Sequence, residues 1–334
     1  MIRPPLRRVD TTAMTSLFKR FALAAAFAGS LLAAVPLAAA PLVEPAELVT
    51  RLQAPTLRIV DIRDGKDAAG KTPYETGHLP GALHAPYTQW RGPKESPGSM
   101  PDAAALTALL QRLGIDRDTE VVLVYEGRNA TDFGSAARVY WTLKTAGLTR
   151  LSILNGGMIA WRAANRPVST EVASVKPSAY VAQIDTRWLA TRDEVAKAQA
   201  ARSAKLIDAR PPAFFEGETR HAAAKAPGTI AGASNLDNAV WFTKGSGSLL
   251  AAADVRRVAQ SNGLEPGSAA GSISFCNTGH WAATNWFVMS EVLGEQNVKM
   301  YPESMVEWSA AGLPMENVPN RLKQLMIDLK LSGS

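Results

Sequence analysis

Cys276 is the only cysteine in the 334-residue chain, and the residues around it are suited to nucleophilic chemistry. The apolar run 272–275 ends at the cysteine, a small polar segment from Asn277 to His280 follows, and an apolar stretch then runs from Trp281 to the glycine at 294. This order predicts a strand, a tight loop and a helix, with the thiol facing the helix N-terminus. Unpaired N–H groups and the helix dipole favour an anion there, so they stabilise the nucleophilic thiolate. Taken alone, a buried structural cysteine fits the same pattern.

The N-terminal segment, residues 1–40, has the pattern of an export signal. Lys19 and Arg20 precede the apolar run Phe21–Leu37, and the alanines at 38–40 offer a cleavage site of small residues. This pattern predicts cleavage at the end of the segment and a periplasmic mature protein, with an uncleaved membrane anchor as the alternative. A single thiol in an exported protein forms no internal disulfide, which favours chemistry over packing.

Composition and charge are those of a globular protein, with 46% hydrophobic and 20% charged residues in a chain long enough for two domains. The formal net charge of +6 is largely explained by the first 40 residues, which carry five basic residues and one acidic residue. The remainder has 31 basic and 29 acidic residues, a net charge of +2. This balance gives no reason to expect a polyanionic partner.

Two halves of the chain carry the same landmarks in the same order, at offsets of 147 to 151 residues. The paired segments are Leu57–Arg63 with Lys205–Arg210, Gly77–Ala82 with Gly228–Ala233, Glu120–Tyr125 with Gly271–Phe275, and Met158–Trp161 with Met305–Trp308. A repeat of this length indicates two homologous domains. The sequence predicts a signal peptide at 1–40, an N-terminal domain at 41–168, a linker at 169–181, a C-terminal domain at 182–316 and a helical tail at 317–334.

Each half alternates short strand patterns with helical patterns. Asp102 to Leu113, for example, has leucines at 106, 109, 110 and 113, which are spaced for one helical face. Such alternation predicts an α/β fold in which each domain is a mostly parallel sheet flanked by helices. Ligands of such sheets bind outside the carboxyl ends of the strands, where Cys276 is expected to lie.

Together these landmarks resemble the rhodanese family, specifically its exported tandem-domain sulfurtransferases, over about residues 41–315. The features that carry the resemblance are the Cys276 loop, Asp61-x-Arg63, Asp208-x-Arg210, Gly-His-x-x-Gly-Ala at 77–82, Gly156–Trp161 and Ser304–Trp308. In this family only the C-terminal domain is usually active. That agrees with the first half, where the position matching Cys276 is expected near Glu126, in a segment without cysteine.

The resemblance implies thiosulfate sulfurtransferase activity with Cys276 as the catalytic residue. Its thiolate takes the outer sulfur of thiosulfate or a similar donor, becomes a persulfide, and passes the sulfur to cyanide or a thiol. We expect the loop N–H groups to hold the anionic persulfide, and Gly279 permits the positive φ that such a cradle needs. The candidate substrate-binding residues are Asn277, Thr278, Gly279, His280, Trp281 and Arg210.

The same resemblance implies no metal and no cofactor. The expected partners are a small-molecule sulfur donor and acceptor, without nucleic acid and without a membrane after signal removal. We expect the protein to be a monomer.

Three features depart from the family pattern. Phe214 stands where many relatives carry Arg, and Pro302-Glu303 stands where many carry Asp-Gly. The loop ends in His280 and Trp281 rather than in Arg or Lys. We therefore expect thiosulfate to be preferred over 3-mercaptopyruvate but to bind weakly, with His280 adding positive charge.

Several of these side chains also have a structural interpretation. Arg210 with Asp208 shapes the pocket or ties the strand to neighbouring loops. His280 contacts the donor or is an exposed loop residue, and Trp281 walls the pocket or packs against the first domain. The tail helix is expected to dock on the body through an apolar face made of Leu322, Leu325, Met326 and Leu329.

The loop sequence and the presence of the cysteine distinguish a thiosulfate sulfurtransferase from several alternative functions. A cysteine-dependent phosphatase needs Arg at the sixth position after Cys, where this chain has Ala282. A mercaptopyruvate sulfurtransferase typically has Gly-Ser-Gly-Val in place of Asn277 to His280. A non-catalytic sulfur-carrier or binding module remains possible, because a carrier would keep the cysteine as well.

Overall fold

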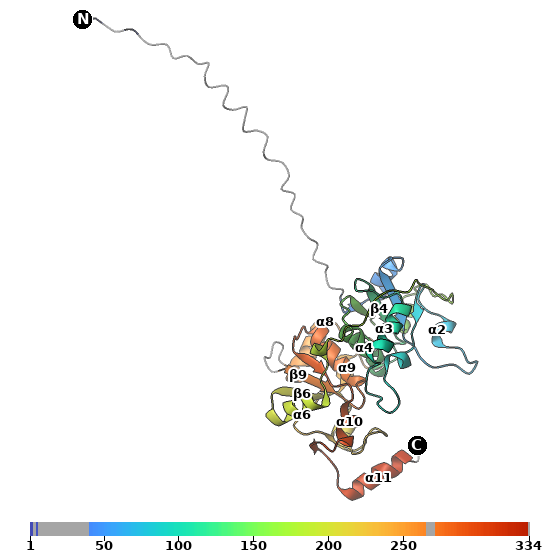
Figure 1. Ribbon diagram of the computed structural model, residues 1–334, viewed down its shortest axis with the longest axis vertical. Coiled ribbons are helices and arrows are strands. Elements are labelled where there is room, and N and C mark those ends of the chain that lie inside the picture. Colours follow the sequence, from blue (N-terminus) through green and yellow to red (C-terminus); the bar gives the residue numbers. More distant parts are fainter. Residues whose placement is uncertain (3–4, 6–39, 265–270, 333–334) are drawn as a thin grey trace. The chain divides into compact units, whose positions relative to one another are not determined.

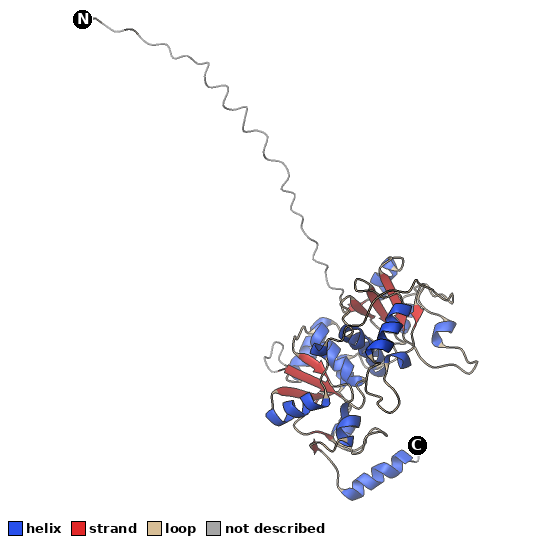
Figure 2. Cartoon of the chain, viewed as in Figure 1, coloured by secondary structure: helices blue, strands red, loops and turns tan. Residues whose placement is uncertain are grey.

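The computed structural model describes residues 1–2, 5, 40–264 and 271–332, and Ala38–Ser334 form one compact unit. The predicted export signal, apart from a few terminal residues, lies outside the described residues. Among the described residues, no helix is long and apolar enough to cross a membrane. Figures 1 and 2 show two sheets, each flanked by helices, which is the predicted α/β architecture.

The first sheet has five parallel strands in the order β1-β5-β4-β2-β3, and the second has four in the order β10-β9-β6-β8. The strands of the first sheet are β1 Leu42–Val43, β2 Leu57–Asp61, β3 Leu83–His84, β4 Glu120–Val124 and β5 Leu151–Leu154. Those of the second are β6 Ala204–Asp208, β8 Ser234–Asn235, β9 Gly271–Phe275 and β10 Val298–Met300. A small antiparallel pair joins β7 Thr229–Ile230 to β11 Met315–Glu316. The prediction of mostly parallel sheets is confirmed.

Four of the described helices begin at a polar residue, Thr72, Asp102, Asn129 or Thr191, whose side chain accepts a hydrogen bond from the first turn. In α3, for example, the Asp102 carboxylate accepts a hydrogen bond from the N–H of Ala105 at 2.8 Å, so the helix starts where the sequence predicts. The α-helices of the first half are α1 Pro45–Leu48, α2 Pro73–Thr76, α3 Ala103–Arg112, α4 Ala130–Thr145 and α5 Gly157–Ala163. Those of the second half are α6 Arg192–Ala201, α7 Pro212–Phe215, α8 Ala252–Ser261, α9 Trp281–Phe287, α10 Ser304–Ala310 and α11 Arg321–Ser332. Short 3₁₀ turns occur at Val49–Arg51, Tyr87–Trp90, Thr186–Trp188 and Asn238–Trp241, and a π-helical segment, Val288–Val292, continues α9.

Strand register fixes which residues of the two halves are equivalent. Asp61 lies opposite Val124 in the first sheet, and the matching Asp208 lies opposite Phe275 in the second. The next residue of each central strand is therefore Tyr125 in one domain and Cys276 in the other. Tyr125 adjoins Glu126, which agrees with the expectation of a matching position near Glu126. Only backbone pairing sets the exact residue, because the offset between the halves drifts along the sequence.

Helices α4 and α9 lie side by side where the two halves meet, and their apolar faces belong to one core (Figure 1). Phe287 packs edge to face against Phe133 and Tyr140, with ring centroids 5.5 and 5.0 Å apart. Lys144 forms an ion pair with Glu291 at 2.6 Å beside these rings. Because α9 directly follows the Cys276 loop, this packing presses the loop against the first domain.

The C-terminal helix α11 corrects one expectation. The predicted docking face, made of Leu322, Leu325, Met326 and Leu329, is more than half exposed at every position. The helix instead buries Ile327, and Asp328 forms an ion pair with Arg220 at 2.9 Å. The ion pair and the buried isoleucine orient the helix, so its broader apolar stripe faces outward.

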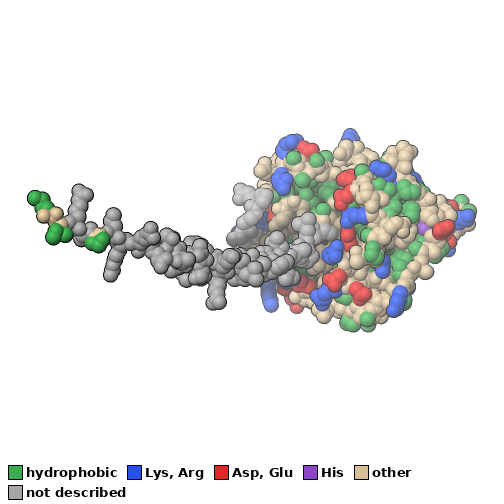
Figure 3. Space-filling view, turned by 90° about the horizontal axis from the view of Figure 1, so that it is seen from above, with side chains coloured by type: hydrophobic (Ala, Val, Ile, Leu, Met, Phe, Trp, Pro, Cys, Tyr) green, Lys and Arg blue, Asp and Glu red, His purple; other side chains and the backbone are tan. Residues whose placement is uncertain are grey.

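The surface shows no gathering of charge by sign on the face drawn in Figure 3. Basic and acidic side chains are interspersed there among neutral and apolar ones. This face therefore presents no broad positive field that would attract a polyanion.

Candidate active site

Cys276 lies at the carboxyl end of β9, which is flanked by β10 and β6. Its side chain is free, and the residue is only 1% exposed. The cysteine N–H donates to the Ser304 hydroxyl at 3.0 Å, and that hydroxyl donates to the Tyr301 carbonyl at 2.7 Å. These bonds anchor the cysteine backbone to the turn before α10 and leave the thiol free of this network.

The carbonyl groups of the loop from Cys276 to Gly279 all accept hydrogen bonds from groups outside the loop. The donors, in order, are Met305 N–H at 3.1 Å, Val306 N–H at 3.2 Å, Arg91 Nη2 at 2.8 Å and Arg138 Nη1 at 3.3 Å. The described chain has no cis peptide bond, and in a trans peptide the C=O and N–H groups point in opposite directions. The N–H groups of residues 277–280 are therefore turned away from these donors.

Those four N–H groups have no hydrogen-bond partner within the described part of the chain. Successive unpaired N–H groups on a tight loop form a concavity that binds anions, such as a thiolate, a persulfide or a sulfonate oxygen. Gly279 has φ +71°, which confirms the expectation of a left-handed residue in the loop. A Cβ at Gly279 would lie 2.6 Å from the Pro302 carbonyl oxygen, so close approach also requires glycine.

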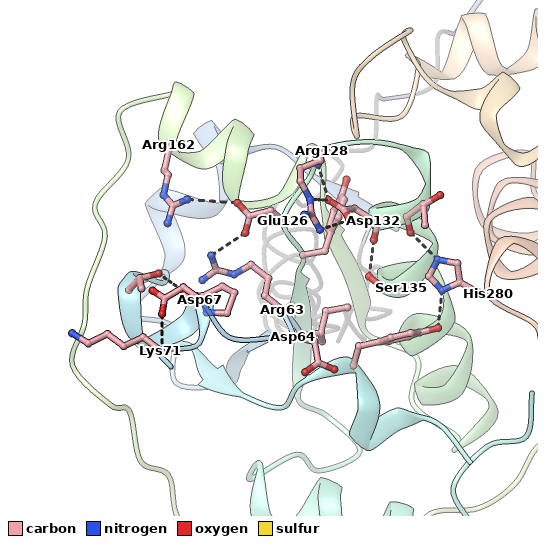
Figure 4. Close-up of a pocket in the computed structure, with 16 residues that line it drawn as sticks. Arg63, Asp64, Asp67, Lys71, Glu126, Arg128, Asp132, Ser135, Arg162 and His280 are labelled. Atoms are coloured by element: carbon pink, nitrogen blue, oxygen red, sulfur yellow. Dashed lines mark hydrogen bonds and ion pairs between the residues drawn. The ribbon is translucent and has the colours of Figure 1, made fainter. Parts of the chain in front are cut away.

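His280 bridges the loop to the first domain through both ring nitrogens. Tyr87 Oη lies 2.9 Å from Nδ1, and the Thr131 carbonyl lies 2.8 Å from Nε2. Since a carbonyl only accepts, Nε2 carries the proton and Nδ1 accepts from the tyrosine hydroxyl, which itself accepts from Arg91 at 3.0 Å. Figure 4 draws both interactions as dashed lines at the His280 ring.

Burial, with the nearby cations of Arg91 and Arg138, lowers the pKa of His280 to about 4. The imidazole is therefore neutral near pH 7. The expectation that His280 adds a positive charge to the loop is wrong, because the sequence does not show how enclosed the ring becomes.

Arg210 reaches the loop, and its guanidinium donates most of its hydrogen bonds to groups of the protein. Its guanidinium holds Asp208 at 2.6 Å, the Gly228 carbonyl at 2.7 Å and the Asn277 side-chain oxygen at 3.4 Å. Only 1% of the residue is exposed. These contacts support the structural interpretation of Arg210, which ties β6 to the neighbouring loop and orients Asn277. Four of the five guanidinium N–H groups have protein partners, and among the described residues only the second N–H on Nη1 has none.

Trp281 packs between the first domain and α7. Its indole N–H donates to the Thr131 hydroxyl at 3.2 Å, and its ring lies edge to face with Phe214 at 5.7 Å. Of the two interpretations drawn from the sequence, these contacts match packing against the first domain.

Arg91 and Arg138 are site residues that sequence reasoning missed. Arg138 lies on α4, is fully buried, and donates through Nη2 to the carbonyls of Gly98 at 2.7 Å and Ser99 at 3.1 Å. Burial, with a further contribution from Arg91, lowers the pKa of Arg138 to about 9, so the group remains a cation at pH 7. One signal was available: a single arginine interrupts the otherwise uncharged run from Phe133 to Leu143.

A cavity of about 530 Å³ lies in front of Glu126 in the first domain and extends to His280 (Figure 4). Glu126 faces into it, paired with Arg63 at 3.2 Å and with Arg162 at 3.6 Å. Tyr125, at the position equivalent to the cysteine, donates its hydroxyl to the Gly247 carbonyl at 2.6 Å, and burial raises its pKa. The first domain thus has a crevice but no comparable nucleophile at its strand end.

Comparison with known proteins agrees with the repeated architecture. The family described as Rhodanese-like domain matches residues 44–164 and 191–311. A thiosulfate sulfurtransferase of Azotobacter vinelandii is 32% identical over 273 residues, covering 81% of this chain and 95% of that protein. The sulfur carrier protein TtuD of Thermus thermophilus is 30% identical over 256 residues, covering 72% of this chain and 86% of that protein.

Among solved structures, the 3-mercaptopyruvate sulfotransferase SseA of Escherichia coli has the same fold, with a TM-score of 0.69 at 23% identity. The match covers 79% of this chain and 98% of SseA.

Proposed function

The chain belongs to the rhodanese family, and we propose that it is a thiosulfate sulfurtransferase that works through a persulfide on Cys276. The observation that carries the proposal is the loop geometry. The sole cysteine begins a loop in which the carbonyls of residues 276–279 accept hydrogen bonds from outside the loop. The N–H groups of residues 277–280 have no partner among the described residues. Relatives named thiosulfate sulfurtransferase, at about 30% identity over most of the chain, support the same chemistry.

The reaction proceeds in two displacements. The Cys276 thiolate attacks the outer sulfur of thiosulfate, a sulfur–sulfur bond forms, and sulfite leaves with the electron pair of the broken bond. The resulting persulfide anion lies against the unpaired loop N–H groups, which stabilise its charge without a general acid or base. Cyanide or a thiolate then attacks the outer sulfur, and the thiolate of Cys276 leaves and is regenerated.

Mass spectrometry of the intact protein after incubation with thiosulfate tests the proposal. We expect the mass of one added sulfur atom on the wild type and none on Cys276→Ser, and addition of cyanide should remove the sulfur as thiocyanate. Circular dichroism of both proteins controls for folding. Sulfur transfer by the serine variant above a few per cent of the wild-type rate would exclude the persulfide mechanism, since the chain has no second thiol.

A sulfur carrier is the second candidate, favoured by the similarity to the sulfur carrier protein TtuD. A carrier would gain sulfur on Cys276 but would not turn over with cyanide or small thiols. Steady-state assays with these acceptors therefore distinguish the two functions.

For the donor, we propose thiosulfate or a similar sulfonate-bearing compound rather than 3-mercaptopyruvate. The loop places the polar side chains of Asn277 and Thr278 beside the cysteine, where they suit sulfonate oxygens. The two donors should be compared by kcat/KM in side-by-side assays. A clear preference for 3-mercaptopyruvate would overturn this assignment.

We also propose that the mature protein is periplasmic and monomeric. The support for export is the basic, apolar and small-residue order of residues 1–40. N-terminal sequencing of the periplasmic fraction should begin near Pro41, whereas an uncleaved membrane-bound form would favour an anchor. Light scattering after size-exclusion chromatography measures the oligomeric state.

A further inference from the structure

The buried cation of Arg138 lacks a carboxylate partner. Within the described residues its guanidinium forms no ion pair, and its hydrogen bonds go to three backbone carbonyls. Its Nε is buried without a hydrogen-bond partner. The ring of Trp141 lies 4.9 Å from the guanidinium carbon, which supplies some compensation. A fully buried arginine held this way is costly unless an anion completes its surroundings.

The charged and titratable groups around Arg138 identify that anion. Glu303 exerts some attraction on the guanidinium, but it forms no ion pair with it, and burial raises the pKa of Glu303. Tyr87 and Cys276 act on Arg138 in the same sense, but burial raises the pKa of the Tyr87 hydroxyl, which is therefore neutral near pH 7. Arg138 also bonds to the Gly279 carbonyl of the loop that begins at Cys276, so the anion we expect to complete its surroundings is the thiolate of Cys276, or an anionic donor bound there.

Arg91 also donates to a loop carbonyl, the one that precedes the carbonyl held by Arg138. Its Nη2 donates to the Thr278 carbonyl at 2.8 Å, and its Nη1 donates to the Tyr87 hydroxyl at 3.0 Å. The two arginines thus hold adjacent carbonyls, those of Thr278 and Gly279. Because the peptides are trans, the same bonds aim the N–H groups of Gly279 and His280 the other way.

We infer that Arg91 and Arg138, both from the domain without a nucleophile, are positioning residues that orient the sulfur-binding loop and make the site selective for anionic reagents. They supply from the neighbouring domain the positive charge that the loop itself lacks. The inference rests on the proposed function for its sulfur chemistry, whereas its electrostatic part holds for any anion that approaches Cys276.

Alkylation of Cys276 tests the charge without any sulfur donor. Iodoacetate is an anion and iodoacetamide is neutral, yet both react with the same thiolate and release iodide. A merely structural loss should change both rates alike, whereas loss of a nearby cation should slow iodoacetate selectively. In Arg138→Met, we expect the ratio of the iodoacetate rate to the iodoacetamide rate to fall about tenfold, and in Arg91→Met about threefold.

Arg138→Lys keeps the charge and should hold the ratio within about twofold of wild type. Arg256→Met removes an exposed arginine on α8 and is the matched control for net charge. If circular dichroism shows that Arg138→Met does not fold, the alkylation ratios of Arg91→Met, at a half-buried position, and of Arg138→Lys still test the inference.

Thiosulfate kinetics give a second, independent measurement. KM for this dianion should rise about tenfold in Arg138→Met, with partial rescue by lysine and no change in Arg256→Met. An unchanged alkylation ratio together with an unchanged KM in folded Arg138→Met and Arg91→Met would overturn the inference. Failure of the wild type to accept sulfur would instead overturn the proposed function, and the alkylation ratio would still report the charge.

Discussion

Substitution of Gly279 by alanine probes whether the curl of the Cys276 loop is required. The residue has φ +71°, a conformation that costs an L-residue about 1–2 kcal/mol. The added Cβ would also approach the Pro302 backbone, with its carbonyl oxygen at 2.6 Å and its Cα at 2.8 Å, and would overlap Arg138 Nη1. Backbone atoms cannot rotate aside, so relief requires the loop to shift, at a further cost of about 1–3 kcal/mol. The total is about 2–5 kcal/mol.

Gly312→Ala separates these two costs. Gly312 has φ +63°, and a Cβ there would meet nothing within 4 Å. This control should therefore lose only the conformational part, about 1–2 kcal/mol. Urea unfolding of both variants under the same conditions, followed by circular dichroism, measures the difference in the free energy of unfolding.

The same loop shift should disturb sulfur loading. Moving the Gly279–His280 peptide away from its position withdraws an N–H donor from the sulfur, and loss of one such donor costs about 10²–10³ in rate in other enzymes. We expect Gly279→Ala to load sulfur from thiosulfate about 10²-fold more slowly, while Gly312→Ala loads normally. Equal stability of the two variants together with unimpaired loading in Gly279→Ala would refute the cradle geometry.

Three further outcomes follow from the contacts. Folding lowers the pKa of His280 from about 6.5 to about 4, so the stability that the neutral ring contributes is fully present above about pH 6.5 and is lost as pH falls toward 4. His280→Gln should therefore lose less stability than wild type between pH 7 and pH 4.5, as measured by urea midpoints. Parallel pH curves for the two proteins would contradict the lowered pKa of His280. Glu126→Ala should change the rate of thiocyanate formation by less than about twofold, because its ion pairs among the described residues are with Arg63 and Arg162 of the first domain. A large fall at unchanged thermal stability would give that crevice a role in catalysis. Tyr125→Phe should lower the free energy of unfolding by about 1–3 kcal/mol, since its hydroxyl bonds to two buried backbone groups; wild-type stability in a urea titration would show that those groups find other partners.

The local order of strand, loop and helix around Cys276 was predictable from the sequence alone. Apolar spacing and capping residues report interactions between near neighbours, which is why the strand end, the helix after the loop and the start of α3 at Asp102 were found. The positive φ of Gly279 was equally predictable, because it follows from the steric freedom of glycine in a tight loop. The repeated landmarks were enough to predict two α/β domains.

Tertiary structure alone decided what surrounds the thiol. Arg91 and Arg138 meet the loop from 187 and 141 residues away in the sequence, and no local pattern reports a hydrogen bond across that separation. The lowered pKa of His280 depends on burial between two domains. The equivalence of Tyr125 with Cys276 depends on strand register, because a repeat whose offset varies by several residues cannot specify one position. Cys276 and its loop are local features of this chain, whereas the two arginines that bond to the loop reach it through packing of the first domain against the second.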